Sequence, residues 1–174
     1  MYHIIAAIGL GHELGKNNDL IWRNKADLQN FKKLTTGKPM VLGYNTLISL
    51  GRLLPNRQHL VLIDNTDRLE GDNLSHLIDH DQVVFFTSIE DLDKFVVEQA
   101  YEEVMVIGGA NVYQQFIKKA TKMTISHILQ SDPEADVFFP SADEWACWYI
   151  TDRYVLDEDF KMETVVYELP LEGE

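Results

Sequence analysis

The spacing of apolar and polar residues predicts a chain in which strands and helices alternate. Short apolar runs bounded by polar or glycine-rich residues are typical of buried strands; they occur at residues 2–8, 39–43, 58–63, 82–86 and 104–107. Helical spacing is found at about 25–35, at 45–50, from Ser88 onward and at about 111–120. This alternation predicts an α/β fold with a mainly parallel central sheet and flanking helices.

The C-terminal third has a different pattern. Residues 121–129, 147–155 and 161–169 alternate between apolar and polar, with no helix predicted between them. We therefore expect antiparallel strands that close one edge of the parallel sheet. Residues 64–81 are polar and irregular, which favours an insertion or a mobile segment. No repeat or linker divides the chain, so we predict a single domain over residues 1–174.

Composition narrows the class of protein. With 45% hydrophobic residues in 174, the chain is expected to bury a full core. Cys147 is the single cysteine, so an internal disulfide is excluded and a reducing compartment is favoured. No apolar run approaches the length of a membrane span. We expect a cytoplasmic protein.

The charge balance excludes some partners. Lys and Arg number 15 against 28 Asp and Glu, a formal net charge of −13. A field of this sign repels nucleic acid and anionic membranes, so neither is an expected partner. Against it, Arg52 and Arg57 form a local cationic pair around Pro55. They are either solvated surface residues or a clamp for a carboxylate.

Asp27 is the strongest candidate for chemistry. If a helix begins near Asn24, then Asp27, Phe31 and Leu34 share one face. A carboxylate beside apolar residues is partly desolvated, which raises its pKa and suits it to proton transfer or to binding a cationic heterocycle. Spacing alone leaves a second interpretation open, in which Asn24 caps the helix and Asp27 simply favours its dipole.

Two turns between a strand and a helix are candidate nucleotide contacts. Gly108 and Gly109 follow an apolar strand, and Gly43 precedes the helix predicted near Thr46. Bare backbone and free N–H groups at such turns suit a phosphate, although Gly108 and Gly109 also fit a tight turn without a ligand. Two such turns at the carboxyl ends of parallel strands favour a nucleotide lying across the sheet.

Other motifs fail on spacing. Gly9 and Gly11 follow a strand, but the third glycine of a dinucleotide fingerprint is misplaced, and Gly15-Lys16 lacks the remaining residues of a phosphate loop. No nucleophile elbow is present. Of the six histidines, only His76 and His80 are spaced as ligands, and we predict no metal site.

Taken together, the motifs resemble those of the dihydrofolate reductase family over essentially the whole chain. The matching pieces, in order, are Ile5-Ala6-Ala7, Gly15 to Trp22, Ala26-Asp27, Phe31-Lys32, Gly43 with Thr46, Ser49 to Arg52, Leu54 to Arg57, Ile107-Gly108-Gly109 and Asp136 to Pro140. The resemblance implies an enzyme that reduces 7,8-dihydrofolate to tetrahydrofolate with a reduced nicotinamide, in support of one-carbon metabolism and thymidylate synthesis, and an antifolate target. It also implies a monomer.

The resemblance assigns roles to the candidate residues. Asp27 would bind the pterin and promote protonation of its N5, with Trp22 and Ser126 holding the network around the carboxylate. Arg57, helped by Arg52, would bind the glutamate tail, and residues 9–23 would form a lid. The apolar slot for the substrate rings would be Ile5, Leu28, Phe31, Leu50, Leu54 and Ile107. The cofactor would lie along Ala7, Leu14, Gly15, Asn45, Thr46, Ile63, Asp64, Gly108, Gly109, Ala110, Asn111, Val112 and Tyr113.

Departures from the family pattern affect the choice of cofactor. Ile21 replaces the usual proline of the lid. Tyr44, Asp64 and Asn111 stand where cationic or hydroxylic groups commonly meet the 2′-phosphate of NADPH. We therefore expect NADPH as the donor but weak discrimination against NADH, unless Arg68 folds back to restore the charge. A reductase for another pterin or pyrimidine, and a binding protein without turnover, remain alternatives.

Overall fold

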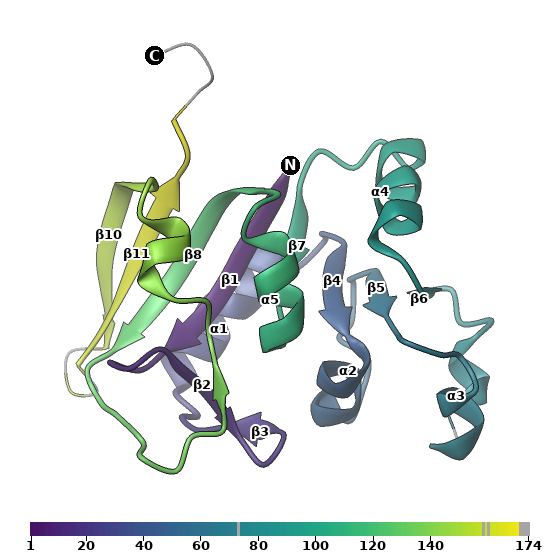
Figure 1. Cartoon of the computed structure of the whole chain (residues 1–174), viewed down its shortest axis with the longest axis horizontal. Coiled ribbons are helices and arrows are strands. Elements are labelled where there is room, and N and C mark those ends of the chain that lie inside the picture. The colour runs from purple at the N-terminus through teal and green to yellow at the C-terminus, as the bar shows by residue number, and fades with distance from the viewer. Residues whose placement is uncertain (73, 158, 160, 171–174) are drawn as a thin grey trace.

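The computed structural model describes residues 1–72, 74–157, 159 and 161–170. Its main sheet has eight strands in the order β10-β11-β8-β1-β7-β4-β5-β6 (Figure 1). The six strands from β8 to β6 run parallel, and β11 and β10 are antiparallel additions at one edge. The strands are β1 (Tyr2–Ile8), β4 (Met40–Gly43), β5 (His59–Leu62), β6 (Val83–Phe86), β7 (Val104–Val106), β8 (Ala120–Ile128), β10 (Tyr149–Asp157) and β11 (Met162–Glu168).

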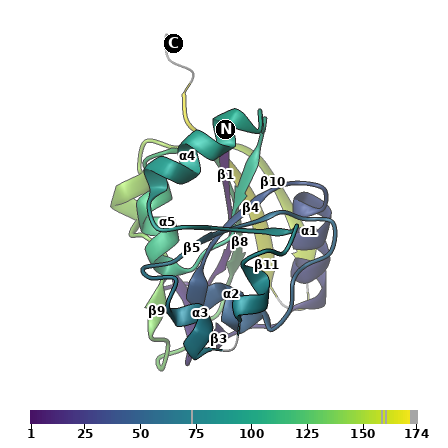
Figure 2. The same ribbon diagram turned by 90° about the vertical axis from the view of Figure 1, so that its right-hand side faces the viewer.

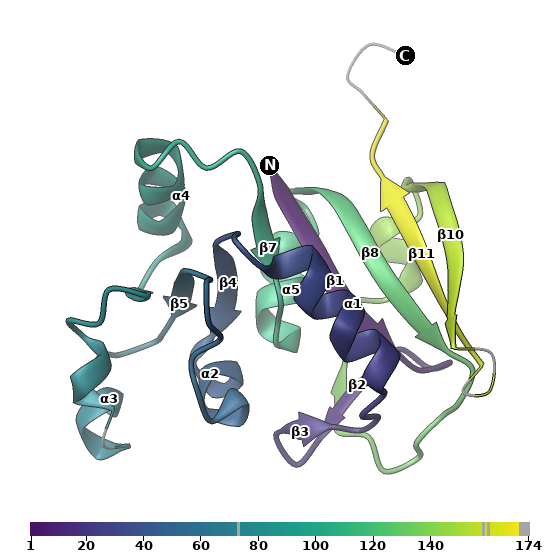
Figure 3. The same ribbon diagram turned by 180° about the vertical axis from the view of Figure 1, so that it is seen from behind.

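Helices cover both faces of this sheet. The helix α5 (Ala110–Phe116) lies in front of it in Figure 1, and α1 (Lys25–Thr35) lies in front in Figure 3, where the molecule is seen from behind. Seen edge-on, α4 (Ile89–Glu98) and α5 lie on one side of the sheet and α1 lies on the other (Figure 2). The helix α2 (Tyr44–Leu50) directly follows β4. The predicted α/β fold is confirmed.

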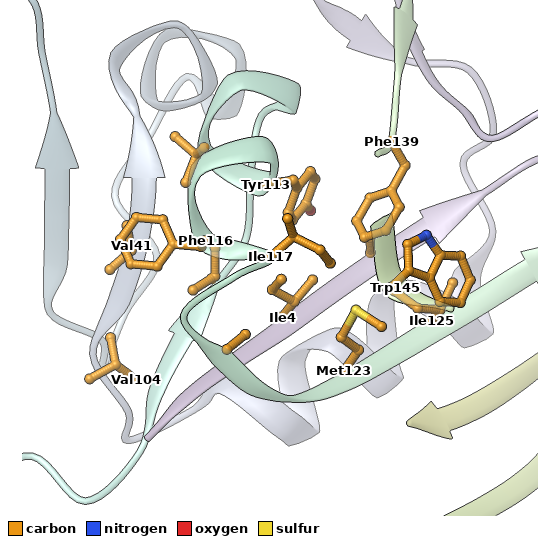
Figure 4. Close-up of a cluster of buried hydrophobic side chains, with 14 of the residues drawn as sticks. Ile4, Val41, Val104, Tyr113, Phe116, Ile117, Met123, Ile125, Phe139 and Trp145 are labelled. Carbon is orange, nitrogen blue, oxygen red and sulfur yellow. The ribbon is translucent and has the colours of Figure 1, made fainter. Parts of the chain in front are cut away.

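The largest core cluster lies between the sheet and α5. Ile4 of β1, Val104 of β7, Met123 of β8 and Phe116 of α5 are fully buried there (Figure 4). The parallel strands are apolar on both faces because helices cover both, which explains their continuous apolar runs in the sequence.

Residues 9–23, the predicted lid, include a β-hairpin. They contain the hairpin of β2 (Glu13–Lys16) and β3 (Asp19–Leu20), and β2 also pairs with β9 (Val137–Phe138) in a separate three-stranded sheet. Asn17 and Asn18 turn the hairpin with positive φ angles of 52° and 60°, a conformation that Asn adopts more readily than most residues.

Three boundaries differ from the predictions. The helix expected to reach Ala120 ends at Phe116, because the backbone tightens with a bond from Lys119 N–H to the Phe116 carbonyl, and Ala120 begins β8. The stretch predicted as an antiparallel strand at 121–129 is β8, which pairs antiparallel with β11 as expected but also pairs parallel with β1 inside the sheet. A 3-10 helix (Ala142–Trp145) interrupts the C-terminal strands, where no helix was expected.

The segment 64–81 is more ordered than predicted. It contains α3 (Arg68–Gly71), whose Leu69 is fully buried, and a 3-10 helix (Ser75–Leu77); residue 73 lies outside the described residues. Two buried leucines, Leu69 and Leu77, tie the segment to the core, and the polar residues around them leave no periodic pattern in the sequence. Among the described residues, no helix is long and apolar enough to cross a membrane.

Candidate active site

Helix α1 carries Asp27 toward the sheet. The helix begins where predicted, because the Asn24 side-chain oxygen accepts a hydrogen bond from the Asp27 N–H at 3.0 Å. Asn24 is itself fixed, since its amide donates to Asp157 of β10 at 2.8 Å. Asp27 therefore combines the two interpretations that the sequence left open: its backbone belongs to the cap and its carboxylate is free to act elsewhere.

A chain of hydroxyls reaches the Asp27 carboxylate. Ser126 of β8 donates to Asp27 Oδ1 at 2.7 Å, and Thr164 of β11 lies 3.2 Å from the Ser126 oxygen. When Asp27 is ionised, the Ser126 proton points at the carboxylate, so Thr164 is the donor of the second bond. Burial raises the pKa of Asp27 above its ordinary value, and the Ser126 bond opposes that rise.

Four of the six predicted wall residues belong to one apolar cluster, which includes Phe31 from the same helix as Asp27. Phe31 and Leu54 pack with Ile5 and Ile107 in this cluster, which also contains the fully buried Met40 and Met105. The other two predicted wall residues behave differently. Leu50 packs in the neighbouring cluster, and Leu28 is 45% exposed. An exposed leucine one residue from Asp27 is a surface that a ligand can cover.

Among the described residues, the Arg57 guanidinium donates hydrogen bonds to neutral groups and pairs with no carboxylate. Its side chain is 6% exposed, and it donates to the Pro55 carbonyl at 3.1 Å and to the Thr35 hydroxyl at 3.0 Å. No acid in the described part of the chain forms an ion pair with Arg57. Burial lowers the pKa of this guanidinium, which still stays charged at neutral pH. A buried cation with only neutral partners is suited to an anionic ligand.

Arg52 is not brought to Arg57. It lines a separate cavity with His76 and His80, beside the end of α2. The described residues contain no group of three or more His, Cys, Asp or Glu side chains that could hold a metal ion.

A second cleft, of about 640 Å³, lies at the carboxyl ends of β4, β5 and β7. Its walls include eight of the predicted cofactor residues: Asn45, Thr46, Ile63, Asp64, Gly109, Ala110, Asn111 and Val112. The backbone approaches closely at the two glycines. A Cβ on Gly43 would lie 3.2 Å from the Val112 side chain, and one on Gly109 would lie 3.3 Å from the Thr46 hydroxyl.

The chemistry of this cleft suits a phosphorylated nucleotide. The first turns of α2 and α5 open into it, with free N–H groups beside the Thr46 hydroxyl. Arg68 adds a guanidinium. These donors, together with the apolar Leu62 and Ile63, are the groups that a nucleotide needs for its phosphates and its base.

Two further predicted cofactor residues, Ala7 and Tyr113, belong to β1 or bond to it. Ala7 of β1 is paired with Ser126, and Tyr113 donates from its hydroxyl to the Ile5 carbonyl at 2.8 Å. Tyr113 is buried behind Gly108, where an added Cβ would lie 3.0 Å from its ring, so it supports the turn from below and does not line the cleft. Burial, and then the charge of Asp27, raise the pKa of the Tyr113 hydroxyl.

The predicted lid residues Leu14, Gly15 and Trp22 lie in or next to the hairpin of β2 and β3. Leu14 packs against the main core, and Gly15 is a buried position of β2 opposite Leu20. Trp22 lies against Gly9, because a Cβ added to Gly9 would overlap its ring and the Glu13 carboxylate. No direct bond joins Trp22 to Asp27 among the hydrogen bonds of the described residues.

Sequence reasoning missed several residues of both clefts. Thr164 was not selected, because a threonine in an apolar strand carries no local signal. Thr87, Ser88, Glu90, Gln115 and Val137 also line the second cleft. Ser88 was identified only as a helix cap, a role it also has, with its hydroxyl accepting from Asp91 N–H at 3.2 Å.

Comparison with known proteins gives a consistent result. Residues 1–169 match the family model described as dihydrofolate reductase. The chain is 34% identical over 149 residues to a dihydrofolate reductase of Haemophilus influenzae, covering 86% of this chain and 84% of the relative. For a Staphylococcus aureus dihydrofolate reductase the identity is 33% over 138 residues, covering 79% and 76%.

A solved structure shows the same architecture. The dihydrofolate reductase from Enterococcus faecalis, in complex with NADP(H) and RAB-propyl, matches with a TM-score of 0.79 and 29% identity. The match covers 97% of this chain and 95% of that one.

Proposed function

This chain belongs to the dihydrofolate reductase family and reduces 7,8-dihydrofolate to 5,6,7,8-tetrahydrofolate with NADPH, and we propose that the reaction takes place between the Asp27 carboxylate and the second cleft. The observation that carries this assignment is a half-buried carboxylate of raised pKa, bonded to Ser126 and carried by the helix that also supplies Phe31 to the apolar cluster. When bound, NADPH supplies the hydride. The protein contributes position, proton control and exclusion of water.

Asp27 binds and orients the pterin in this proposal. A carboxylate beside an apolar wall accepts hydrogen bonds from the ring's amino group and its N3 side, which selects one tautomer. Asp27 then favours a proton at N5 through that tautomer and through water, without touching N5 itself. Ser126 keeps the carboxylate in one orientation and limits how far burial raises its pKa.

Arg57 binds the acidic tail of the substrate. Its two neutral partners hold the guanidinium in place, and the absence of an acidic partner in the described chain leaves its charge for the substrate carboxylate. Phe31 and Leu54, which belong to the same wall, pack against the rings that connect the pterin to this tail. Because Arg52 faces another cavity, Arg57 carries this contact alone.

The second cleft holds the cofactor. Thr46 and the first turns of α2 and α5 provide donors for its phosphates, and Gly43 and Gly109 allow the backbone to approach them. The hairpin of β2 and β3 closes over the site, since Asn18 and Val137 line the same cleft as the two helices.

The test is NADPH oxidation, followed by absorbance with and without dihydrofolate. Oxidation that depends on dihydrofolate, and that is not seen with a reduced pterin lacking the glutamyl tail at the same concentration, supports the proposal. Equal turnover of both substrates would indicate a reductase for another pterin. Tight binding of both ligands without oxidation would indicate a binding protein.

We further propose that residues 1–174 act as one monomeric unit in the cytoplasm, without nucleic acid or membrane partners. The net charge of −13 and the single, exposed Cys147 support this. Light scattering that gives a mass well above the 20.0 kDa of one chain would contradict it.

A further inference from the structure

The second cleft contains one cation. Among the described residues that line it, Arg68 is the only Lys or Arg, and Asp64 and Glu90 are the acids. Arg68 comes from α3, in the polar segment that the sequence suggested was irregular. In a chain of net charge −13, an arginine kept at a phosphate-binding cleft requires an explanation.

Two contacts fix the Arg68 guanidinium over α2. Its central carbon lies 4.6 Å from the centre of the Tyr44 ring, and Nη2 donates to the Asn45 side-chain oxygen at 3.0 Å. The Tyr44 ring is fixed in turn, because its hydroxyl donates to Asp72 at 2.7 Å. Stacking on an aromatic ring orients the plane of a guanidinium while leaving its edge available for an anion.

The existing acidic partner of Arg68 is weak. The Arg68 Nη1 atom lies 3.5 Å from Asp64 Oδ2, and the Asp64 side chain is 89% exposed. An exposed pair at that distance contributes little, so a ligand anion can replace it at small cost. A phosphate monoester carries more charge than a carboxylate and accepts two parallel N–H bonds from a guanidinium.

We propose that Arg68 recognises the phosphate on the adenosine ribose of NADPH and sets the preference of this enzyme for NADPH over NADH. The proposal rests on the proposed function only in placing the cofactor in the second cleft. Tyr44, Asp64 and Asn111 supply no cation, and Arg68 replaces it from a different part of the chain. Asp64 acts against the phosphate and in favour of a free ribose hydroxyl, so the preference depends on one arginine and is moderate.

Arg68 also ties α3 to α2, and a purely structural role must be distinguished from phosphate recognition. We would titrate the intact protein with NADPH, NADH and adenosine 2′,5′-bisphosphate, without substrate, following intrinsic fluorescence or heat. Arg68→Met should weaken NADPH and the bisphosphate by about 10- to 30-fold, the range for one partly exposed charge-assisted contact, and leave NADH within about twofold. A structural role would instead weaken all three ligands together.

Arg153→Met is the matched control. Arg153 is also partly exposed and also lies 3.5 Å from a carboxylate oxygen, that of Glu163, but on β10 away from the cleft. The Arg153→Met variant loses the same charge as Arg68→Met, but at a position far from the cleft, where salt screens it. Its affinity for NADPH should therefore stay within about twofold of wild type. Asp64→Asn should strengthen NADPH about two- to fivefold and should not strengthen NADH, because only the phosphate is repelled by Asp64.

The outcomes separate this inference from the proposed function. Loss of NADPH and NADH binding in equal measure, or unchanged NADPH binding in Arg68→Met, would overturn the role of Arg68. A wild-type protein that binds neither nicotinamide would overturn the proposed function. Wild-type binding with turnover, combined with an insensitive Arg68→Met variant, would leave the proposed function standing and refute only the inference.

Discussion

The hydrogen bond from Ser126 to Asp27 allows a quantitative prediction for the pKa of Asp27. The hydroxyl lies 2.7 Å from Asp27 Oδ1, where it stabilises the ionised form. A hydrogen bond to a charged group contributes about 1.5–3 kcal/mol, and about 1.4 kcal/mol corresponds to one pH unit. Because the site is only half-buried and water can replace the hydroxyl, we expect a contribution at the lower end of this energy range. Ser126→Ala should therefore raise the pKa of Asp27 by about one unit.

NMR of the Asp27 carboxyl carbon in the ligand-free protein measures this shift directly. The pH profile of hydride transfer in a single turnover should move in the same direction. Ser126→Thr keeps the hydroxyl and is the matched control. Thr164→Val removes only the second bond, at 3.2 Å, and should cause a smaller rise. Superimposed titration curves for Ser126→Ala and wild type would refute the relay from Thr164 through Ser126 to Asp27.

Three further results are expected. Burial raises the pKa of Asp27 in the folded protein, so its ionised form costs stability, and that cost appears as pH rises through the window between the unfolded and folded pKa values. Asp27→Asn should thus stabilise the protein by about 1 kcal/mol at neutral pH in urea unfolding, and a gain that did not shrink in acid would refute this. Arg57→Leu should raise the dihydrofolate dissociation constant by roughly 30- to 1,000-fold and spare a pteridine without the tail; equal weakening of both in calorimetry would indicate a role in the fold. Gly9→Ala places a Cβ 2.9 Å from the Gln130 carbonyl and overlaps Trp22, so urea unfolding should show a loss of about 1–3 kcal/mol, and no loss would show that the lid adjusts freely.

The parts of the site that follow from local patterns were predictable. The sequence predicts Asn24 as a cap and a helix on which Asp27 and Phe31 are one turn apart, and the structure shows the cap and the helix. Glycines at strand ends likewise predict the second cleft. A close approach of the backbone to a ligand requires glycine, and glycine can be recognised in the sequence.

Residues that depend on distant contacts were not predictable in this way. Thr164 reaches Ser126 only through the register of β11 on β8, which pairs these two residues across a separation of 38 in sequence. Arg68 enters the second cleft because buried Leu69 anchors α3, and a four-residue helix has no periodicity to detect. Arg52 and Arg57 are close in sequence, yet they face different cavities.

The central claim is that the Asp27 carboxylate promotes protonation of the substrate. Its most direct test is the single-turnover rate of hydride transfer in Asp27→Asn and wild type across a range of pH. Near neutral pH the variant should be slower by at least about 100-fold, the usual contribution of a positioned acid or base, with NADPH affinity unchanged. The deficit should narrow as pH falls, because the substrate then arrives already protonated. A variant that kept the wild-type rate at neutral pH would contradict the account and leave Asp27 with its helix-capping role.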